Sequence, residues 1–146
     1  MTSTPITEFL LNFSSNSGSQ NFSGATTQFA PAFLAAGPNG AQAVSASDFA
    51  KALPARKQHF ESLGLRAMSL TSVAETTLSA RYTLARTHWR VEFAEPIPGE
   101  PELVVESIFI VDTVANPFQI VLYLSCHDLG ALLQARKSAN RDAPPA

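Results

Sequence analysis

Two side chains capable of acid–base chemistry stand four residues apart near the end of the chain. Tyr123 and His127 belong to an apolar stretch that we expect to form a strand, in which residues four apart share one face. A tyrosine could donate a proton to a carbonyl group while a histidine removes a neighbouring one. Four residues of strand span ~13 Å, so the two groups would act at opposite ends of a ligand. Alternatively, both side chains lie on an outer sheet face or in a dimer contact.

A second polar group alternates along another expected strand. Arg86, His88 and Arg90 would share one face and could bind an anion such as a carboxylate. Charges of this kind more often pair across strands, and Glu106 is then a candidate partner. The weak candidates for a catalytic acid or base are therefore His127, Tyr123, His88 and Asp112.

The other polar motifs favour structural roles. Asp128 precedes an expected helix and would cap its N–H groups. Cys126 and His127 are adjacent in the strand, so they point to opposite faces and cannot form a nucleophile–base pair. A single cysteine excludes an internal disulfide, and no spacing of histidine, cysteine or acidic residues predicts a metal site. Residues 37–40 lack the lysine and hydroxyl of a phosphate-binding loop, and we expect no cofactor.

The composition predicts a single globular domain over residues 1–146. The chain is 45% hydrophobic and 15% charged with a net charge of −2, which excludes a disordered chain and gives no basic surface for nucleic acid. No apolar run approaches the ~18 residues of a membrane span, and the first residues do not resemble a signal peptide. We expect a cytoplasmic protein with no nucleic-acid or membrane partner and a flexible tail over about 136–146.

Helix signals dominate the first half of the chain, where apolar residues recur at spacings of three and four. Capping and turn residues bound three expected helical segments, over residues 4–13, 22–33 and 45–63. The second of these contains Phe29 and Phe33, and the turn at residues 37–40 ends it. Gly64 ends the third.

Strand signals follow Gly64. We expect strands over residues 65–77, 80–93, 103–113 and 118–126, a proline-rich loop over 95–101, and a short closing helix after Asp128. Helices followed by strands predict an α+β fold with the helices on one side of an antiparallel sheet.

Both faces of the last two expected strands carry apolar residues. In the last strand, alternation places Ile120, Leu122 and Leu124 on one face and Val121 with Tyr123 on the other. The helices can cover one face only. An apolar patch on the other commonly marks a protein contact, so we expect a homodimer through the outer sheet face.

The order of these elements, with a last strand that ends in the step His127-Asp128-Leu129, resembles the nuclear-transport-factor-2-like (NTF2-like) superfamily, in its SnoaL-like bacterial branch. Residues 29–40, 49–64, 82–89 and 120–129 carry the resemblance. It implies a strongly curved antiparallel sheet, a cone or half-barrel, covered by the three N-terminal helical segments with a pocket between. Members of the superfamily are often dimers, and some are isomerases, cyclases or dehydratases. No catalytic residue is carried over from them.

Aromatic side chains are the expected lining of such a pocket, because small-molecule sites are mostly apolar. The candidate ligand-binding residues are Phe29, Phe33, Phe60, Trp89 and Phe109. Each could equally be ordinary core. We expect a homodimeric domain that binds a small apolar or aromatic molecule without a metal or cofactor. The alternatives are a SnoaL-like enzyme performing acid–base chemistry on a small hydrophobic substrate, and a dimerisation or scaffold module without a ligand.

Overall fold

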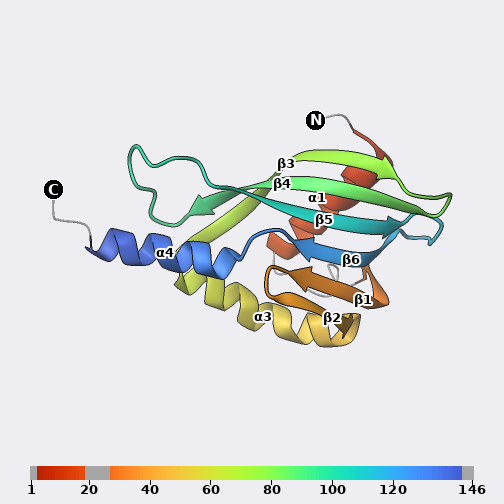
Figure 1. Cartoon of the computed structure of the whole chain (residues 1–146), viewed down its shortest axis with the longest axis horizontal. Coiled ribbons are helices and arrows are strands. Elements are labelled where there is room, and N and C mark those ends of the chain that lie inside the picture. The colour runs from red at the N-terminus through yellow and green to blue at the C-terminus, as the bar shows by residue number, and fades with distance from the viewer. Residues whose placement is uncertain (1–2, 19–26, 143–146) are drawn as a thin grey trace.

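The chain forms an α+β fold built on one open, six-stranded mixed sheet with strand order β2-β1-β6-β5-β4-β3 (Figure 1). The computed structural model describes residues 3–18 and 27–142. The elements are α1 (Pro5–Gly18), β1 (Phe29–Gly37), β2 (Gly40–Ser45), α3 (Ala46–Ser62), β3 (Leu65–Thr77), β4 (Tyr82–Phe93), β5 (Val104–Asp112), β6 (Gln119–Ser125) and α4 (Leu129–Asp142). Within these described ranges, no helix is both long enough and apolar enough to cross a membrane.

The capping signals of the first and third expected helices are confirmed. Thr4 Oγ1 accepts a hydrogen bond of 3.0 Å from the Thr7 N–H at the start of α1. Ser45 Oγ accepts one of 3.1 Å from the Asp48 N–H at the start of α3. Gly64 follows the end of α3 with φ +98°, a conformation that favours glycine.

The prediction of a second helix is wrong where the structure describes it, because Phe29–Gly37 is strand β1. Its earlier part, from Phe22, lies outside the described residues. Phe29 and Phe33 are four residues apart, a spacing that places two side chains on one face of a helix and equally on one face of a strand. Pro31 is exposed and lies within a register shift of the pairing with β6, where its missing N–H interrupts no ladder.

The expected turn at residues 37–40 is confirmed, although it joins two strands. Gly37 pairs with Gly40 across a β1–β2 hairpin, and Gly40 has φ +129°. β1 then runs parallel to β6, with Ala35 opposite Tyr123. The expectation of a wholly antiparallel sheet is therefore wrong at this one pairing, while β3–β4, β4–β5 and β5–β6 are antiparallel as expected.

Bulges bend the sheet and change which residues face inward. The β3–β4 pairing shifts register twice, and the β5–β6 pairing shifts between Ile110 and Val111. Because of the shift between β5 and β6, Ile120 lies opposite inward-facing Val111, whereas Leu122 lies opposite outward-facing Ile110. The regular alternation expected for the last strand is thus wrong at this point.

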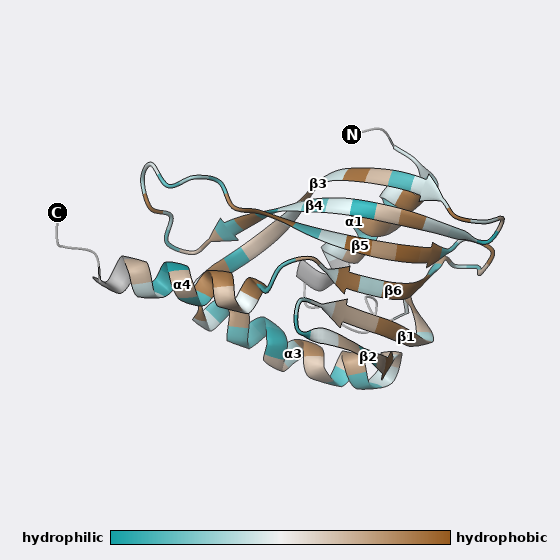
Figure 2. Cartoon of the chain, viewed as in Figure 1, coloured by the Kyte–Doolittle hydropathy of each residue, from teal (hydrophilic) through white to brown (hydrophobic). Residues whose placement is uncertain are grey.

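The core lies between α1 and the inner face of the sheet. Leu10 of α1 and Phe109 of β5 are both fully buried, and the Phe13 ring contacts the rings of Phe29 and Phe109 edge-on. α3 packs against β1, β2 and β3. Figure 2 shows apolar residues along β5 and hydrophilic ones on α3, as expected for a central strand and a surface helix.

The closing helix is longer than expected, because α4 continues through Asp142 where the sequence suggested a tail from about residue 136. Arg136 holds it to the rest of the fold. Its guanidinium donates hydrogen bonds of 3.0 and 2.8 Å to the Glu100 carboxylate, and lies 3.6 Å from the centre of the Phe93 ring. Asp128 caps the helix as expected, accepting a hydrogen bond of 3.0 Å from the Ala131 N–H.

Candidate functional site

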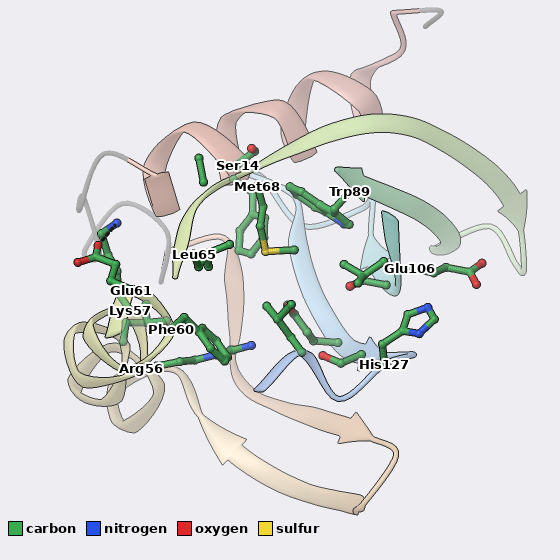
Figure 3. Close-up of a pocket in the computed structure, with 18 of the residues that line it drawn as sticks. Ser14, Arg56, Lys57, Phe60, Glu61, Leu65, Met68, Trp89, Glu106 and His127 are labelled. Carbon is green, nitrogen blue, oxygen red and sulfur yellow. Dashed lines mark ion pairs between the residues drawn. The ribbon is translucent and has the colours of Figure 1, made fainter. Parts of the chain in front are cut away.

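A hollow of about 240 Å³ lies between α3 and the inner face of the sheet (Figure 3). Apolar side chains from α1, α3 and three strands form most of its wall, including Phe13, Phe49, Phe60, Met68, Trp89 and Val105. No residue of α3 is fully buried, although Phe49, Leu53 and Phe60 point toward the sheet. The helix therefore covers the sheet without filling the space beneath it.

Trp89 forms one wall of the hollow and is fixed in place. Its indole Nε1 donates a hydrogen bond of 2.8 Å to Thr87 Oγ1, which donates one of 2.8 Å to the Ser107 carbonyl on β5. The only polar atom of the side chain is thus engaged within the protein. Trp89 offers the hollow an apolar aromatic surface.

Ser14 of α1 lines the hollow, and so do three hydroxyl groups of β5 and β6: those of Ser107, Tyr123 and Ser125. None of these three hydroxyls has a hydrogen-bond partner among the residues that the structure describes. The Tyr123 ring packs edge-on against Phe109 at 5.0 Å and stacks on Phe29 at 6.3 Å between centroids. The wall formed by β5 and β6 is therefore apolar with a few unengaged hydroxyls, the arrangement typical of a small-molecule site.

The structure separates the expected aromatic residues into three groups. Phe60 and Trp89 line the hollow, and Phe33 lines a second hollow beside it. Phe29 and Phe109 are almost fully buried in the core behind Tyr123 and line neither space.

Of the four acid–base candidates, Tyr123 and His127 line the hollow. In Figure 3, His127 and Glu106 lie at the same end of it. His88 is on the opposite sheet face, where its Nδ1 lies 2.9 Å from Ser72 Oγ. Two of the four candidates, Tyr123 and His127, therefore share the hollow, and the other two, His88 and Asp112, lie outside it.

Asp112 lies at the end of β5, outside the hollow, and its carboxylate is fully engaged. It pairs with Arg81 at 2.9 Å and accepts hydrogen bonds from the N–H groups of Val114 and Ala115. The bond from Arg81 lowers the pKa of Asp112 below its ordinary value. These contacts indicate that Asp112 stabilises the turn between β5 and β6.

The expected cross-strand pairing of Arg86 with Glu106 is confirmed. The hydrogen bond from Arg86 is the main cause of a lowered pKa at Glu106, and His88 Nε2 lies 3.9 Å from the same carboxylate. Glu106 also reaches the rim of the hollow near His127, so its charge is neutralised there by Arg86.

Arg56 is a site residue that the sequence analysis missed. It lines the hollow from α3, where the spacing Phe49, Leu53, Arg56, Phe60 places it in the apolar stripe of the helix. Its guanidinium carbon lies 5.3 Å from the centre of the Phe60 ring, and Figure 3 shows it extending from α3 past that ring. A cation within an apolar stripe was the signal that could have identified it.

A second hollow of about 400 Å³ adjoins the first, between α3 and the β1–β2 hairpin. It is more polar, with Asn39 and Gln42 in its wall. The residues that line both spaces are Phe49, Arg56, Tyr123 and Ser125. Arg56 and two of the hydroxyls therefore stand where the two spaces meet.

Cys126 and the acidic residues offer no further reactive centre in the described part of the chain. Burial raises the pKa of the half-buried Cys126 thiol, which therefore stays protonated at neutral pH. Across residues 3–18 and 27–142, no three histidine, cysteine or acidic side chains are grouped closely enough to hold a metal ion.

No protein-family model and no curated protein sequence matches this chain. Solved structures do. An NTF2-like protein of unknown function from Shewanella oneidensis aligns with TM-score 0.66 and 11% identity over 84% of this chain and 97% of its own. A ketosteroid isomerase-like protein from Shewanella frigidimarina aligns with TM-score 0.64 and 9% identity over 84% and 94%. A scytalone dehydratase-like protein from Novosphingobium aromaticivorans aligns with TM-score 0.60 and 12% identity over 82% and 78%.

Each of these three similarities covers 82–84% of this chain. The protein has the NTF2-like fold, as the sequence resemblance implied. At such low identity, these neighbours show only the architecture of the chain.

Proposed function

We propose that this protein is a small-molecule-binding NTF2-like domain whose ligand is small and largely apolar. The hollow beneath α3 is the observation that carries the proposal. Its wall combines the Phe60 and Trp89 rings with the hydroxyls of Ser107, Tyr123 and Ser125, which have no hydrogen-bond partner in the part of the chain that the structure describes. An apolar wall favours burial of a hydrocarbon or aromatic body, and a few hydroxyls fix its orientation.

The size of the hollow limits the ligand. Small-molecule pockets commonly measure roughly 300–1,000 Å³, and the first hollow alone is about 240 Å³. One aromatic ring with a short substituent suits this volume. A longer ligand would extend past Tyr123 into the second hollow.

Trp89 supplies a direct test, because it is the only tryptophan in the chain and it lines the hollow. A bound ring should change its fluorescence emission, and native mass spectrometry of the purified protein should show the added mass of a retained ligand. Ala67 lines the hollow from β3, so Ala67→Phe should fill part of it and weaken binding. Ala74→Phe, at an exposed position of the same strand, is the matched control.

The proposal fails if wild-type protein retains no ligand and its emission does not respond to small aromatic probes. A domain with no occupied interior would instead favour the scaffold function. Equal binding by wild-type protein and Ala67→Phe would place the ligand elsewhere.

The same proposal includes a homodimer through the outer sheet face. Leu84, Ile108 and Ile110 lie on the face opposite Trp89 and remain only half-buried in one chain, as do Leu122 and Leu124. α1 and α3 both pack on the inner side, so neither of these helices covers the apolar side chains of the outer face. A second copy would bury it.

An enzyme is the second candidate, and the shared position of Tyr123 and His127 favours it. Both line the hollow, so a ligand carbonyl could lie near one and an acidic proton near the other. Such an enzyme would exchange the α-protons of a bound carbonyl compound with solvent deuterium, which NMR detects. Loss of exchange in both Tyr123→Phe and His127→Gln, with binding retained, would support it. Unchanged exchange in both variants would exclude these residues.

A further inference from the structure

We propose that the ligand carries a carboxylate, and that Arg56 binds this group where the two hollows meet. The inference rests on the proposed function, because it names the chemical class of the ligand for the same pocket.

The position of Arg56 in α3 is the first argument. Phe49, Leu53 and Phe60 form the stripe of the helix that lies over the hollow, and Arg56 occupies the next place in that stripe. Arg56 is an exposed residue, so in the free protein water hydrates its guanidinium, which reaches the hollow from the solvent side. In the described part of the chain, Arg56 forms no ion pair, and its contact with the Phe60 ring leaves its N–H donors unused.

The balance of charges around the hollow is the second argument. Its acidic residues are already neutralised, since Lys57 pairs with Glu61 at 2.9 Å and Arg86 pairs with Glu106. Arg56 and Arg66 also line it, and neither has a carboxylate partner among the described residues. The hollow is therefore positively charged in a chain whose net charge is −2.

The neighbouring hydroxyls complete an anion site. Tyr123 and Ser125 line both hollows together with Arg56, and their hydroxyls have no partner within the described residues. A guanidinium can donate two parallel hydrogen bonds to a carboxylate, and hydroxyls can donate to its remaining lone pairs. The apolar body of the same molecule would then lie against Trp89 and Met68.

Three probes with one apolar body separate the head groups: 3-phenylpropanoate, 3-phenylpropan-1-ol and 3-phenylpropylphosphonate. Their affinities for the full chain are measured by Trp89 emission and by calorimetry. Arg56→Gln removes the charge while keeping polarity. Lys51→Gln removes a charge from an exposed position of the same helix outside both hollows.

We expect wild-type protein and Lys51→Gln to bind the carboxylate about tenfold or more tightly than the alcohol, because hydrogen bonds to charged groups are the stronger ones. Arg56→Gln should lose this preference while its affinity for the alcohol stays unchanged. That pair of results supports the inference.

Equal affinity of wild-type protein for the acid and the alcohol would overturn the proposal that the ligand carries a carboxylate. The proposed function as an apolar pocket would still stand. A preference for the acid that survives in Arg56→Gln would overturn the role of Arg56. Tighter binding of the phosphonate, lost in Arg56→Gln, would replace the carboxylate with a phosphate-type group. Failure of all three probes to bind would overturn the proposed function as well.

Discussion

The Trp89 indole and the Thr87 hydroxyl, two residues apart on β4, are joined by a hydrogen bond of 2.8 Å. The Thr87 hydroxyl accepts this bond and donates another to the Ser107 carbonyl on β5. One buried oxygen thus fixes the ring that forms a pocket wall and ties it to the neighbouring strand.

Thr87→Val keeps the shape of this side chain and removes the oxygen. The Trp89 N–H then stays buried without a partner, which typically costs about 1–3 kcal/mol. We expect the free energy of unfolding in urea to fall by this amount, with a change in Trp89 emission. Thr83→Val is the control, since Thr83 is buried on the same strand face and its hydroxyl has no partner in the described residues. Equal losses in the two variants would contradict the role given to Thr87.

Two adjacent leucines test the packing of α1. Leu10 is 0% exposed in the core, whereas Leu11 is 41% exposed. We expect Leu10→Ala to lower the free energy of unfolding by about 2–5 kcal/mol, because it leaves a cavity under the helix. Leu11→Ala should change it by no more than about 0.5 kcal/mol, as at most surface positions. Similar effects of both substitutions would mean that α1 does not present this face to the sheet.

Ile108 tests the proposed homodimer. It lies on the outer face between Arg86 of β4 and Leu124 of β6. A glutamate there would bury a charge in a dimer contact, so Ile108→Glu should convert the dimer to a monomer in sedimentation velocity. Leu78→Glu makes the same change at an exposed residue after β3 and should leave the mass unchanged. A monomeric wild-type protein would refute the dimer outright.

The Arg136–Glu100 pair predicts how stability depends on pH. The hydrogen bonds from Arg136 hold the pKa of Glu100 below its ordinary value. A lowered folded-state pKa stabilises the fold fully above the unfolded value of ~4.3 and ceases to do so as the pH falls through the folded one. Arg136→Gln should therefore lower Tm near neutral pH and differ less from wild type as the solution is acidified.

Arg90→Gln provides the comparison for this experiment, because the Arg90–Glu92 pair at 3.3 Å is more exposed. Its Tm should stay close to that of wild type. A constant difference between Arg136→Gln and wild type at every pH would show that the stacking on Phe93, and not the ion pair, holds α4 in place.

The parts of the fold that depend on local chemistry were predictable from the sequence. Thr4 and Ser45 cap helices, Gly64 ends one, and the strand over 65–77 has the expected bounds. The errors in the predicted secondary structure arise where contacts between distant parts of the chain determine whether a segment is a helix or a strand, or where it ends. Phe29 and Phe33 fit a helix and a strand equally, and the Arg136 side chain of α4 bonds to Glu100, which lies 36 residues earlier in the chain.

The candidate site was predictable only in part, for a similar reason. Tyr123 and His127 were found by extending the alternation of the last strand, although β6 ends at Ser125 and His127 lies in the bend that follows it. Arg56 was missed because charged helix residues are ordinarily assigned to the solvent side. Arg56 is exposed and also lines the hollow, and only the position of the hollow in the fold reveals this second contact.

The pairing of β1 with β6 also sets the order in which the molecule can assemble. The two strands lie far apart in the chain, at residues 29–37 and 119–125. During synthesis the β1–β2 hairpin emerges long before β6, so the edge of β1 that pairs with β6 stays unpaired until the last strand is made. Such distant pairing slows folding. A nascent chain that stops before β6 would expose that edge to other strands, and to chaperones that bind them.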